Sequence, residues 1–138
     1  MCLTHVDSTE LEEVEGEGWK AIYSYPLGWD SLFPFSFPPV APPPYTYNTW
    51  IQRIVFKTVS GVAEIISDDS KAYPPGFHLF PTEMDALEYM HRIYRYIDSG
   101  HNSLKVVKVK YKNVLVRGSQ DGLPCIVAEY IYIEQEEV

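Results

Sequence analysis

Alternation of bulky apolar side chains with polar or small ones predicts short β-strands along much of the chain. The alternating segments are rich in β-branched and aromatic residues, which favour the extended conformation. The predicted strands cover residues 18–24, 48–57, 62–66, 104–111, 114–117 and 125–134. The second and third can form a hairpin, and a Ser-Gln-Asp-Gly sequence is a turn signal before the last strand.

One segment has the helical period instead. Thr82 is a suitable N-cap, and Glu83 and Asp85 lie in the first turn, where the helix dipole favours acidic residues. An Asp-Ser-Gly sequence at residues 98–100 supplies a stop signal. We therefore predict a helix over residues 83–97, with an apolar face formed by Ala86, Met90, Ile93 and Ile97.

Strands dominate around this one principal helix, which predicts an α+β fold with a mainly antiparallel β-sheet. At 138 residues the chain has the size of one domain. Residues 1–17 are polar and acidic with little periodicity, so we expect an acidic flexible arm there, attached where Leu3 and Val6 contact the core. Residues 18–138 then form a single α+β domain.

Residues 25–47 break the alternation, because they hold seven prolines and seven aromatic residues. Each proline lacks an N–H and biases its predecessor towards extended conformations, so we predict a long loop rich in proline and aromatic residues. The loop either packs over the sheet as a lid or exposes its aromatic rings to a partner. The candidate partner-binding residues are Trp29, Phe35, Phe37, Tyr45 and Tyr47.

The formal net charge of −8 argues against sequence-independent binding of nucleic acid, which needs Lys and Arg to neutralise phosphates. Nine of the nineteen acids lie near the two chain ends, whereas several cations gather in residues 105–117. Lys108, Lys110 and Arg117 are candidates for binding an anion such as a nucleotide phosphate. The alternative is that these charges form solvated strand faces.

No stretch approaches the ~20 apolar residues needed to cross a bilayer, and the first residues do not form a signal peptide. We therefore expect a cytoplasmic protein without membrane contact. Two cysteines are too few for a disulfide framework, which predicts free thiols at Cys2 and Cys125. Cys2 and His5 have the spacing of half a metal site, but no second pair follows, so we expect no metal.

Glu129 is the first candidate catalytic residue. By the period-two rule it shares one strand face with Cys125, Val127, Ile131 and Ile133. A carboxylate in such an apolar row is costly unless it is paired or used in acid–base chemistry. If the opposite strand face forms the core instead, Glu129 faces solvent.

His78 is the second catalytic candidate. Alternation places Phe77 and Leu79 on one side of a short segment, and His78 and Phe80 on the other. The imidazole then lies at the entry to the predicted helix beside an aromatic ring. A histidine that simply packs in the core is the alternative interpretation.

The order of these motifs resembles that of a known group of proteins. Residues 76–80, a helix with Ala86 and Tyr89, a strand over residues 106–116 and a final strand over residues 128–132 resemble small uncharacterised proteins of phages, viruses and bacteria. That group implies no established activity.

More remotely, the same order is similar to the ADP-ribosyltransferase superfamily. In that superfamily a Gly-aromatic strand, matched by Gly76 and Phe77, precedes a helix with Ala and Tyr, and a late Glu-Tyr strand carries the catalytic glutamate. The resemblance implies Glu129 in that role, next to Tyr130, and NAD as cofactor. The predicted strand 18–24 has no His or Arg, which is the residue type that holds NAD in that superfamily.

Two functions follow as hypotheses. The first is a non-enzymatic binding or accessory domain, of viral origin if the resemblance to phage and viral proteins holds. It would need no cofactor and would lie in the cytoplasm, or the host-cell cytoplasm if viral. The aromatic-proline loop and a sheet face would contact a protein partner or small ligand. The alternative is a divergent ADP-ribosyltransferase-like or other NAD- or nucleotide-handling protein, with residues 105–117 near phosphates.

Overall fold

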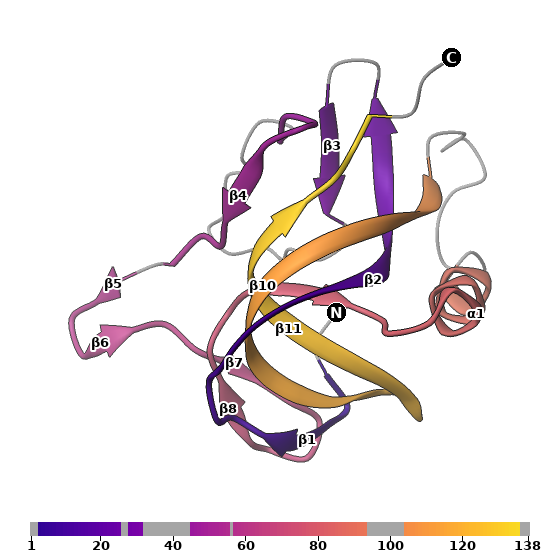
Figure 1. Cartoon of the computed structure of the whole chain (residues 1–138). Helices are drawn as coiled ribbons and strands as arrows, with labels where there is room; N and C mark the ends of the chain where they lie inside the picture. The colour runs from indigo at the N-terminus through magenta and orange to yellow at the C-terminus, as the bar shows by residue number, and fades with distance from the viewer. Residues whose placement is uncertain (1–2, 26–27, 32–44, 56, 94–103, 136–138) are drawn as a thin grey trace.

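The computed structural model describes residues 3–25, 28–31, 45–55, 57–93 and 104–135 (Figure 1). The first strands are β1 (His5–Ser8), β2 (Glu12–Tyr25), β3 (Gly28–Ser31), β4 (Trp50–Gln52), β5 (Lys57–Thr58) and β6 (Gly61–Val62). Then come β7 (Ile65–Ile66), β8 (Ala72–Tyr73), β9 (Phe77–Leu79), helix α1 (Glu83–Ile93), β10 (Leu104–Gln120) and β11 (Leu123–Tyr132). The strand pairs are antiparallel, so the predicted fold class is confirmed.

The long strand β10 organises the main sheet, whose central order is β3-β2-β10-β11-β4. Its first half pairs with β2, its last residues pair with β1, and β11 lies along its other edge. The sequence predicted two strands here, 104–111 and 114–117, but the structure has one. Asn113 has a φ of 59°, and the register with both neighbouring strands shifts close to it. An irregularity of this kind bends a strand without ending it.

The sheet closes on itself into a small ring of strands. β9 pairs with β11, and Phe80, just after β9, makes two backbone hydrogen bonds of 2.8 Å with Trp19 of β2. Strands β2, β10, β11 and β9 therefore follow one another around a closed ring (Figure 1). We call the contact between β2 and β9 the seam, because it contains a single backbone pair.

Two hydrophobic clusters form the core, and β11 contributes to both. Cys125 and Val127 belong to the first cluster, with Tyr73, Phe80 and residues of α1. Ile126 and Ala128 belong to the second cluster, with residues of β2, β3, β9 and β10. Both faces of this half of β11 are therefore buried, whereas the sequence suggested that one face or the other would form the core.

Helix α1 begins at Glu83 as predicted, and Thr82 is its N-cap, because its Oγ1 accepts a hydrogen bond from the Asp85 N–H at 3.2 Å. Ala86 and Tyr89 face the first cluster. The predicted continuation over residues 94–97 lies outside the described residues. Among the helices of the described residues, none has the length and apolar character needed to cross a membrane.

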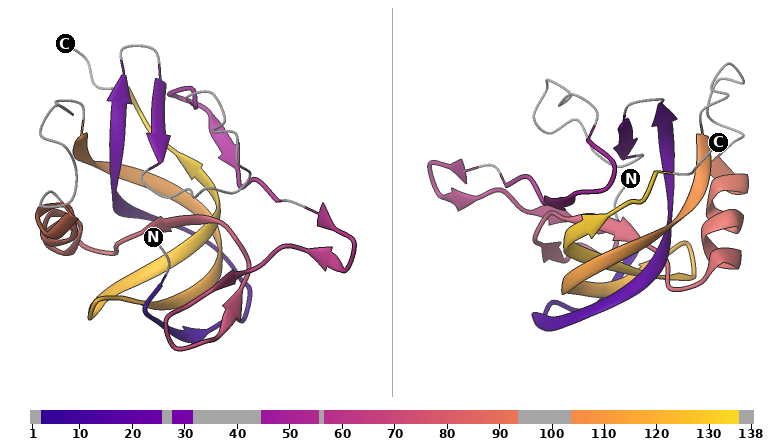
Figure 2. Two further views of the ribbon diagram at one scale, coloured as in Figure 1. Left: turned by 180° about the vertical axis from the view of Figure 1, so that it is seen from behind. Right: turned by 45° about the horizontal axis from the view of Figure 1, so that its top comes forward.

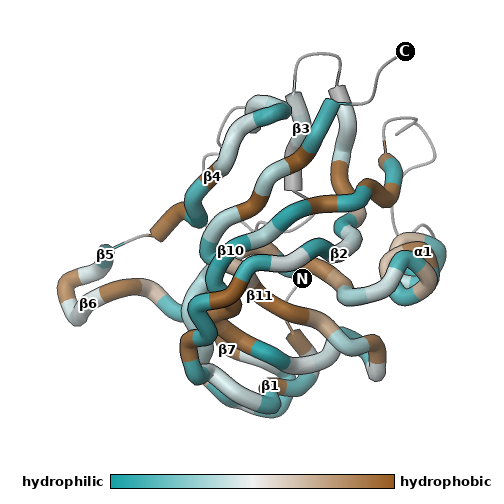
Figure 3. Tube along the Cα trace, viewed as in Figure 1, coloured by the Kyte–Doolittle hydropathy of each residue, from teal (hydrophilic) through white to brown (hydrophobic). Residues whose placement is uncertain are grey.

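Two small hairpins complete the fold, one of β5 with β6 and the other of β7 with β8. The β5–β6 hairpin extends away from the ring on the side opposite α1 (Figure 2). Its strand residues are exposed and its tip carries the exposed Val59. The tube at this hairpin includes segments coloured as hydrophobic (Figure 3). The predicted hairpin of 48–57 with 62–66 is thus much shorter than expected.

The N-terminal region corrects one prediction. Residues 5–8 and 12–17, which we expected in an acidic flexible arm, lie in β1 and in the first half of β2. The acids of β2 face cations of β10, so strand pairing neutralises charges that look unsuited to a sheet in the sequence. The expected contacts of Leu3 and Val6 with the core are confirmed, because both side chains are buried.

Candidate functional site

The two predicted catalytic residues have separate surroundings. Glu129 is half-buried on β11, where its Oε1 accepts a hydrogen bond from Asn113 Nδ2 at 2.9 Å. Strict alternation would put Val127, Glu129 and Ile131 on one face of β11. Instead, Val127 belongs to the first core cluster and Ile131 to the second, so the cluster that this row of side chains faces changes at Glu129. The carboxylate therefore sits at the boundary of the two clusters rather than inside one apolar row.

His78 is fully buried on β9, where its ring lies edge-on to Tyr73 at 5.8 Å between centroids. Its Nε2 is 3.0 Å from the Tyr73 hydroxyl, and that hydroxyl accepts a hydrogen bond from the Leu3 N–H at 2.9 Å. Burial, followed by the nearby charge of Lys20, lowers the pKa of His78 to about 3. The imidazole is therefore neutral at physiological pH and links the N-terminal segment to the core.

Lys20 was not among the residues singled out from the sequence. In the structure the residue is buried, with only 1% of it exposed. Its Nζ donates a hydrogen bond of 2.7 Å to the carbonyl oxygen of His78. In an antiparallel ladder continued from the Trp19 and Phe80 pair, Ala21 would lie opposite His78. The lysine side chain thus binds a β9 carbonyl just beyond the seam's single backbone pair.

Burial alters the proton affinity of this group of residues. It lowers the pKa of Lys20 to about 7, and the nearby Cys125 has a smaller, opposite effect that raises this pKa. It raises the pKa of Cys125 to about 12 and also raises that of Tyr89. An amine with a pKa near 7 has nucleophilic character at neutral pH. Its burial keeps solutes away, however, so the geometry favours a structural role.

Aromatic residues on the two sides of the proline-rich segment contact each other through backbone and side chain. Trp29 and Tyr45 exchange two backbone hydrogen bonds of 2.9 and 2.8 Å, and their rings lie 4.8 Å apart. Trp29 is completely buried, so in this conformation it cannot contact a partner. Tyr47 is half-buried and its hydroxyl lies 2.8 Å from Ser24 Oγ. Phe35 and Phe37 lie outside the described residues.

The predicted anion-binding cations are exposed on β10, and two of them form ion pairs with β2. Lys108 Nζ is 2.9 Å from Glu17 Oε2, and Arg117 makes two hydrogen bonds to the carboxylate of Glu12. The pKa values of both glutamates are lowered, chiefly by these hydrogen bonds. Lys110 lies 5.4 Å from the centroid of the Tyr132 ring.

The contact between Lys110 and Tyr132 belongs to a wider surface, which we call the outer face. Across the strands, Trp50 lies opposite Tyr132, Tyr132 opposite Lys110, and Tyr130 opposite both Gln52 and Lys112. The Trp50 and Tyr132 rings are 5.5 Å apart, and Lys112 Nζ is 4.2 Å from the centroid of the Trp50 ring. The six side chains are exposed or half-buried. They are Trp50, Gln52, Lys110, Lys112, Tyr130 and Tyr132.

A signal for the outer face exists in the sequence. Lys108, Lys110 and Lys112 alternate with apolar residues, and so do Tyr130 and Tyr132, which indicates one shared strand face in each case. The pairing of the two strands, and the position of Trp50 beside them, cannot be read from that alternation.

Comparisons of the chain with protein-family models, with curated proteins and with solved structures found no match. Within the described residues, no group of three or more His, Cys, Asp or Glu side chains could hold a metal ion.

Proposed function

We propose that the protein is a non-enzymatic binding domain that holds a protein partner on the outer face. The observation that carries the proposal is the row of solvent-accessible rings and lysines across β4, β11 and β10. Tryptophan and tyrosine are the side chains that most often dominate binding energy at protein interfaces. Trp50 and Tyr132 are therefore the expected anchors.

The charge on and beside the outer face favours a protein partner over a polyanion. Lys112 lies 3.8 Å from Glu15 and Lys108 pairs with Glu17, so positive and negative charges alternate there. A net charge of −8 would also repel nucleic acid. A surface of mixed charge around aromatic anchors fits the polar rim and apolar centre of a protein interface.

The proline-rich segment gives the proposal a second part. In the chain it lies between β3, whose Trp29 pairs with Tyr45, and β4, which begins at Trp50. Phe35 and Phe37 of this segment are proposed as further partner-contacting residues.

The test is affinity capture from the source cells with the purified domain as bait. We expect the double variant Trp50→Ala, Tyr132→Ala to lose a partner that the wild-type protein retains. The control variant, Met84→Ala with Leu87→Ala, removes two exposed apolar side chains of α1 and should retain it. Replacing Phe35, Phe37 and Tyr45 together tests the loop. Equal capture by all variants, with the folds intact, would refute the proposal.

A second candidate function is the handling of NAD or a nucleotide, with Glu129 as catalytic carboxylate. It is supported by the half-buried position of Glu129 and by the hydrogen bond from Asn113 that orients it. A thermal-shift titration with NAD, ADP-ribose and nucleotides tests it, because a ligand at ~100 times its dissociation constant adds roughly 2.7 kcal/mol of stability. A saturable shift that weakens in Glu129→Gln would favour this function, and a flat response would exclude these ligands.

A further inference from the structure

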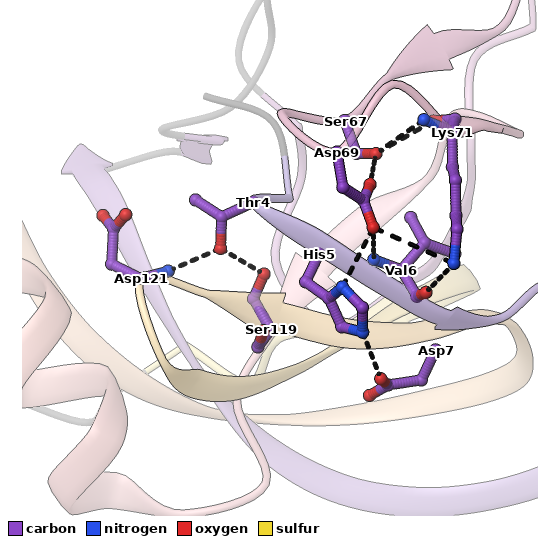
Figure 4. A network of polar contacts seen from close by, with 9 residues as sticks. All are labelled: Thr4, His5, Val6, Asp7, Ser67, Asp69, Lys71, Ser119 and Asp121. Atoms are coloured by element: carbon purple, nitrogen blue, oxygen red, sulfur yellow. Dashed lines mark hydrogen bonds and ion pairs between the residues drawn. The ribbon is translucent and has the colours of Figure 1, made fainter.

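The N-terminal strand β1 is fastened to the segment between β7 and β8 by a network of polar contacts (Figure 4). In this network His5 contacts two carboxylates, with Nδ1 2.9 Å from Asp69 Oδ2 and Nε2 2.9 Å from Asp7 Oδ1. Asp69 Oδ2 also accepts a hydrogen bond from the Val6 N–H at 3.3 Å, and Lys71 Nζ donates to the Val6 carbonyl at 3.2 Å. The segment therefore holds β1 by both backbone groups of one residue.

The two short contacts of His5 impose a chemical requirement. Carboxylate oxygens only accept hydrogen bonds, while a neutral imidazole has one N–H and an imidazolium has two. Both contacts can be hydrogen bonds at the same time only when both ring nitrogens carry protons. In the neutral ring, one nitrogen lone pair faces a carboxylate oxygen, and that contact becomes repulsive.

Within the part of the chain that the structure describes, the charged groups in contact with His5 or with its partner Asp69 come from two segments. Asp7 comes from β1 itself, and Asp69 and Lys71 come from the segment between β7 and β8. On β10 the residue opposite His5 is Ser119, which carries no charge. The Ser67 hydroxyl, more than any other group, holds the pKa of Asp69 below its ordinary value, with smaller contributions from Val6 N–H, Lys71 and His5. Histidine is the residue type that ordinarily changes charge near neutral pH.

We propose that His5 is a pH-sensitive latch, which fastens β1 to the β7–β8 segment when its ring is protonated and loosens it when the ring is neutral. Loosening β1 would also affect the core, because Leu3 and Val6 of the N-terminal segment are buried in the first cluster. β1 also covers the edge of β10 at Gly118, where the His5 carbonyl would lie only 2.2 Å from an added Cβ. Loosening β1 therefore exposes apolar surface and a strand edge.

Amide hydrogen exchange, followed by NMR from about pH 5.5 to about pH 8 and corrected for intrinsic rates, tests the latch. The amides of Thr4, bonded to the Ser119 carbonyl, and of Val6 report on β1. The amide of Asn48, bonded to the Ile133 carbonyl, is the remote control. Since exposed ion pairs are weak, we expect Thr4 and Val6 to lose protection by about two- to fivefold as the pH rises. Asn48 should not follow them.

The variant His5→Gln keeps a polar side chain without a titrating ring, so it should abolish the pH response of Thr4 and Val6. Nitrogen chemical shifts of the ring should show both nitrogens protonated in the pH range in which Thr4 and Val6 have their higher protection. The latch is overturned if the response survives in His5→Gln, if it is absent in the wild type, or if Asn48 loses protection equally, which would indicate a global change.

Discussion

At the scale of single residues, the buried polar groups connect distant parts of the chain. The Tyr73 hydroxyl lies between the Leu3 N–H and His78 Nε2, and it thereby joins the N-terminal segment, β8 and β9. Each of these groups lies in the interior, where a lost hydrogen bond is not replaced by one to water. The contribution of this hydroxyl to stability should therefore be large for one atom.

The variant Tyr73→Phe tests this contribution. It keeps the aromatic ring in the first core cluster and removes only the hydroxyl, so we expect a loss of about 1–3 kcal/mol in the free energy of unfolding. Urea denaturation with an unchanged slope measures it. Tyr130→Phe is the matched control, because that ring is half-buried on the outer face, and its change should stay within about 0.5 kcal/mol. Equal effects of the two substitutions would contradict the inference.

The residues of the candidate site were predictable in unequal measure. The alternation that placed His78 and Phe80 opposite Phe77 and Leu79 agrees with the core clusters, since Phe77 and Leu79 share one cluster and Phe80 belongs to the other. Lys20 was not predictable, because its role depends on a seam that joins residues far apart in sequence. Trp29 looked available for binding in the sequence, but in the structure its backbone pairs with Tyr45 and its ring packs against Tyr45 and Phe77 in the second cluster.

At the scale of elements, glycine decides how closely β2 can approach its neighbours. A Cβ at Gly18 would lie 2.5 Å from Leu79 Cδ1 and 2.9 Å from the Phe80 carbonyl oxygen, which belongs to the seam. At Gly16, on the same strand, the nearest atoms are those of the Tyr111 side chain, with its hydroxyl at 2.5 Å. The end of a side chain can move away, whereas a paired backbone cannot.

We therefore expect Gly18→Ala to destabilise the protein by about 1–3 kcal/mol through overpacking, and Gly16→Ala to cost clearly less. Both variants change the intrinsic strand preference in the same way, so their difference reports the close approach alone. Urea denaturation gives the stabilities, and hydrogen exchange at the Trp19 and Phe80 amides shows whether the seam opens. A larger effect at Gly16 than at Gly18 would contradict this account.

The predicted elements succeeded where local patterns determine them. The start of α1 follows from its N-cap, and the turn before β11 follows from Asp121 and Gly122, which both have positive φ values. The first half of β2 was not predicted as a strand, because its glutamates alternate with small residues and the segment has no regular spacing of apolar side chains. Only pairing with β10, where Glu12 meets Arg117 and Glu17 meets Lys108, makes that sequence suitable for a strand.

At the scale of the whole molecule, the closed ring encloses an amine whose proton affinity links stability to pH. The pKa of Lys20 falls to about 7 in the folded protein because burial disfavours the ammonium form. In the unfolded chain a lysine keeps its proton up to about pH 10.4. Between these two pH values the unfolded chain binds more protons than the folded protein, so the contribution of Lys20 to stability grows as the pH rises.

The difference in unfolding free energy between the wild type and Lys20→Met isolates this effect, because contributions from Cys125 and Tyr89 occur in both proteins. We expect the difference to be flat below about pH 7 and then to shift in favour of the wild type by up to about 1.4 kcal/mol per pH unit. Urea denaturation at intervals from about pH 6 to about pH 9 measures it. Lys108→Met is the control, because this exposed lysine should give a difference that changes little over the same range. A flat difference for Lys20→Met would show that the buried amine keeps its proton, and the hydrogen bond to His78 would then be that of an ammonium group.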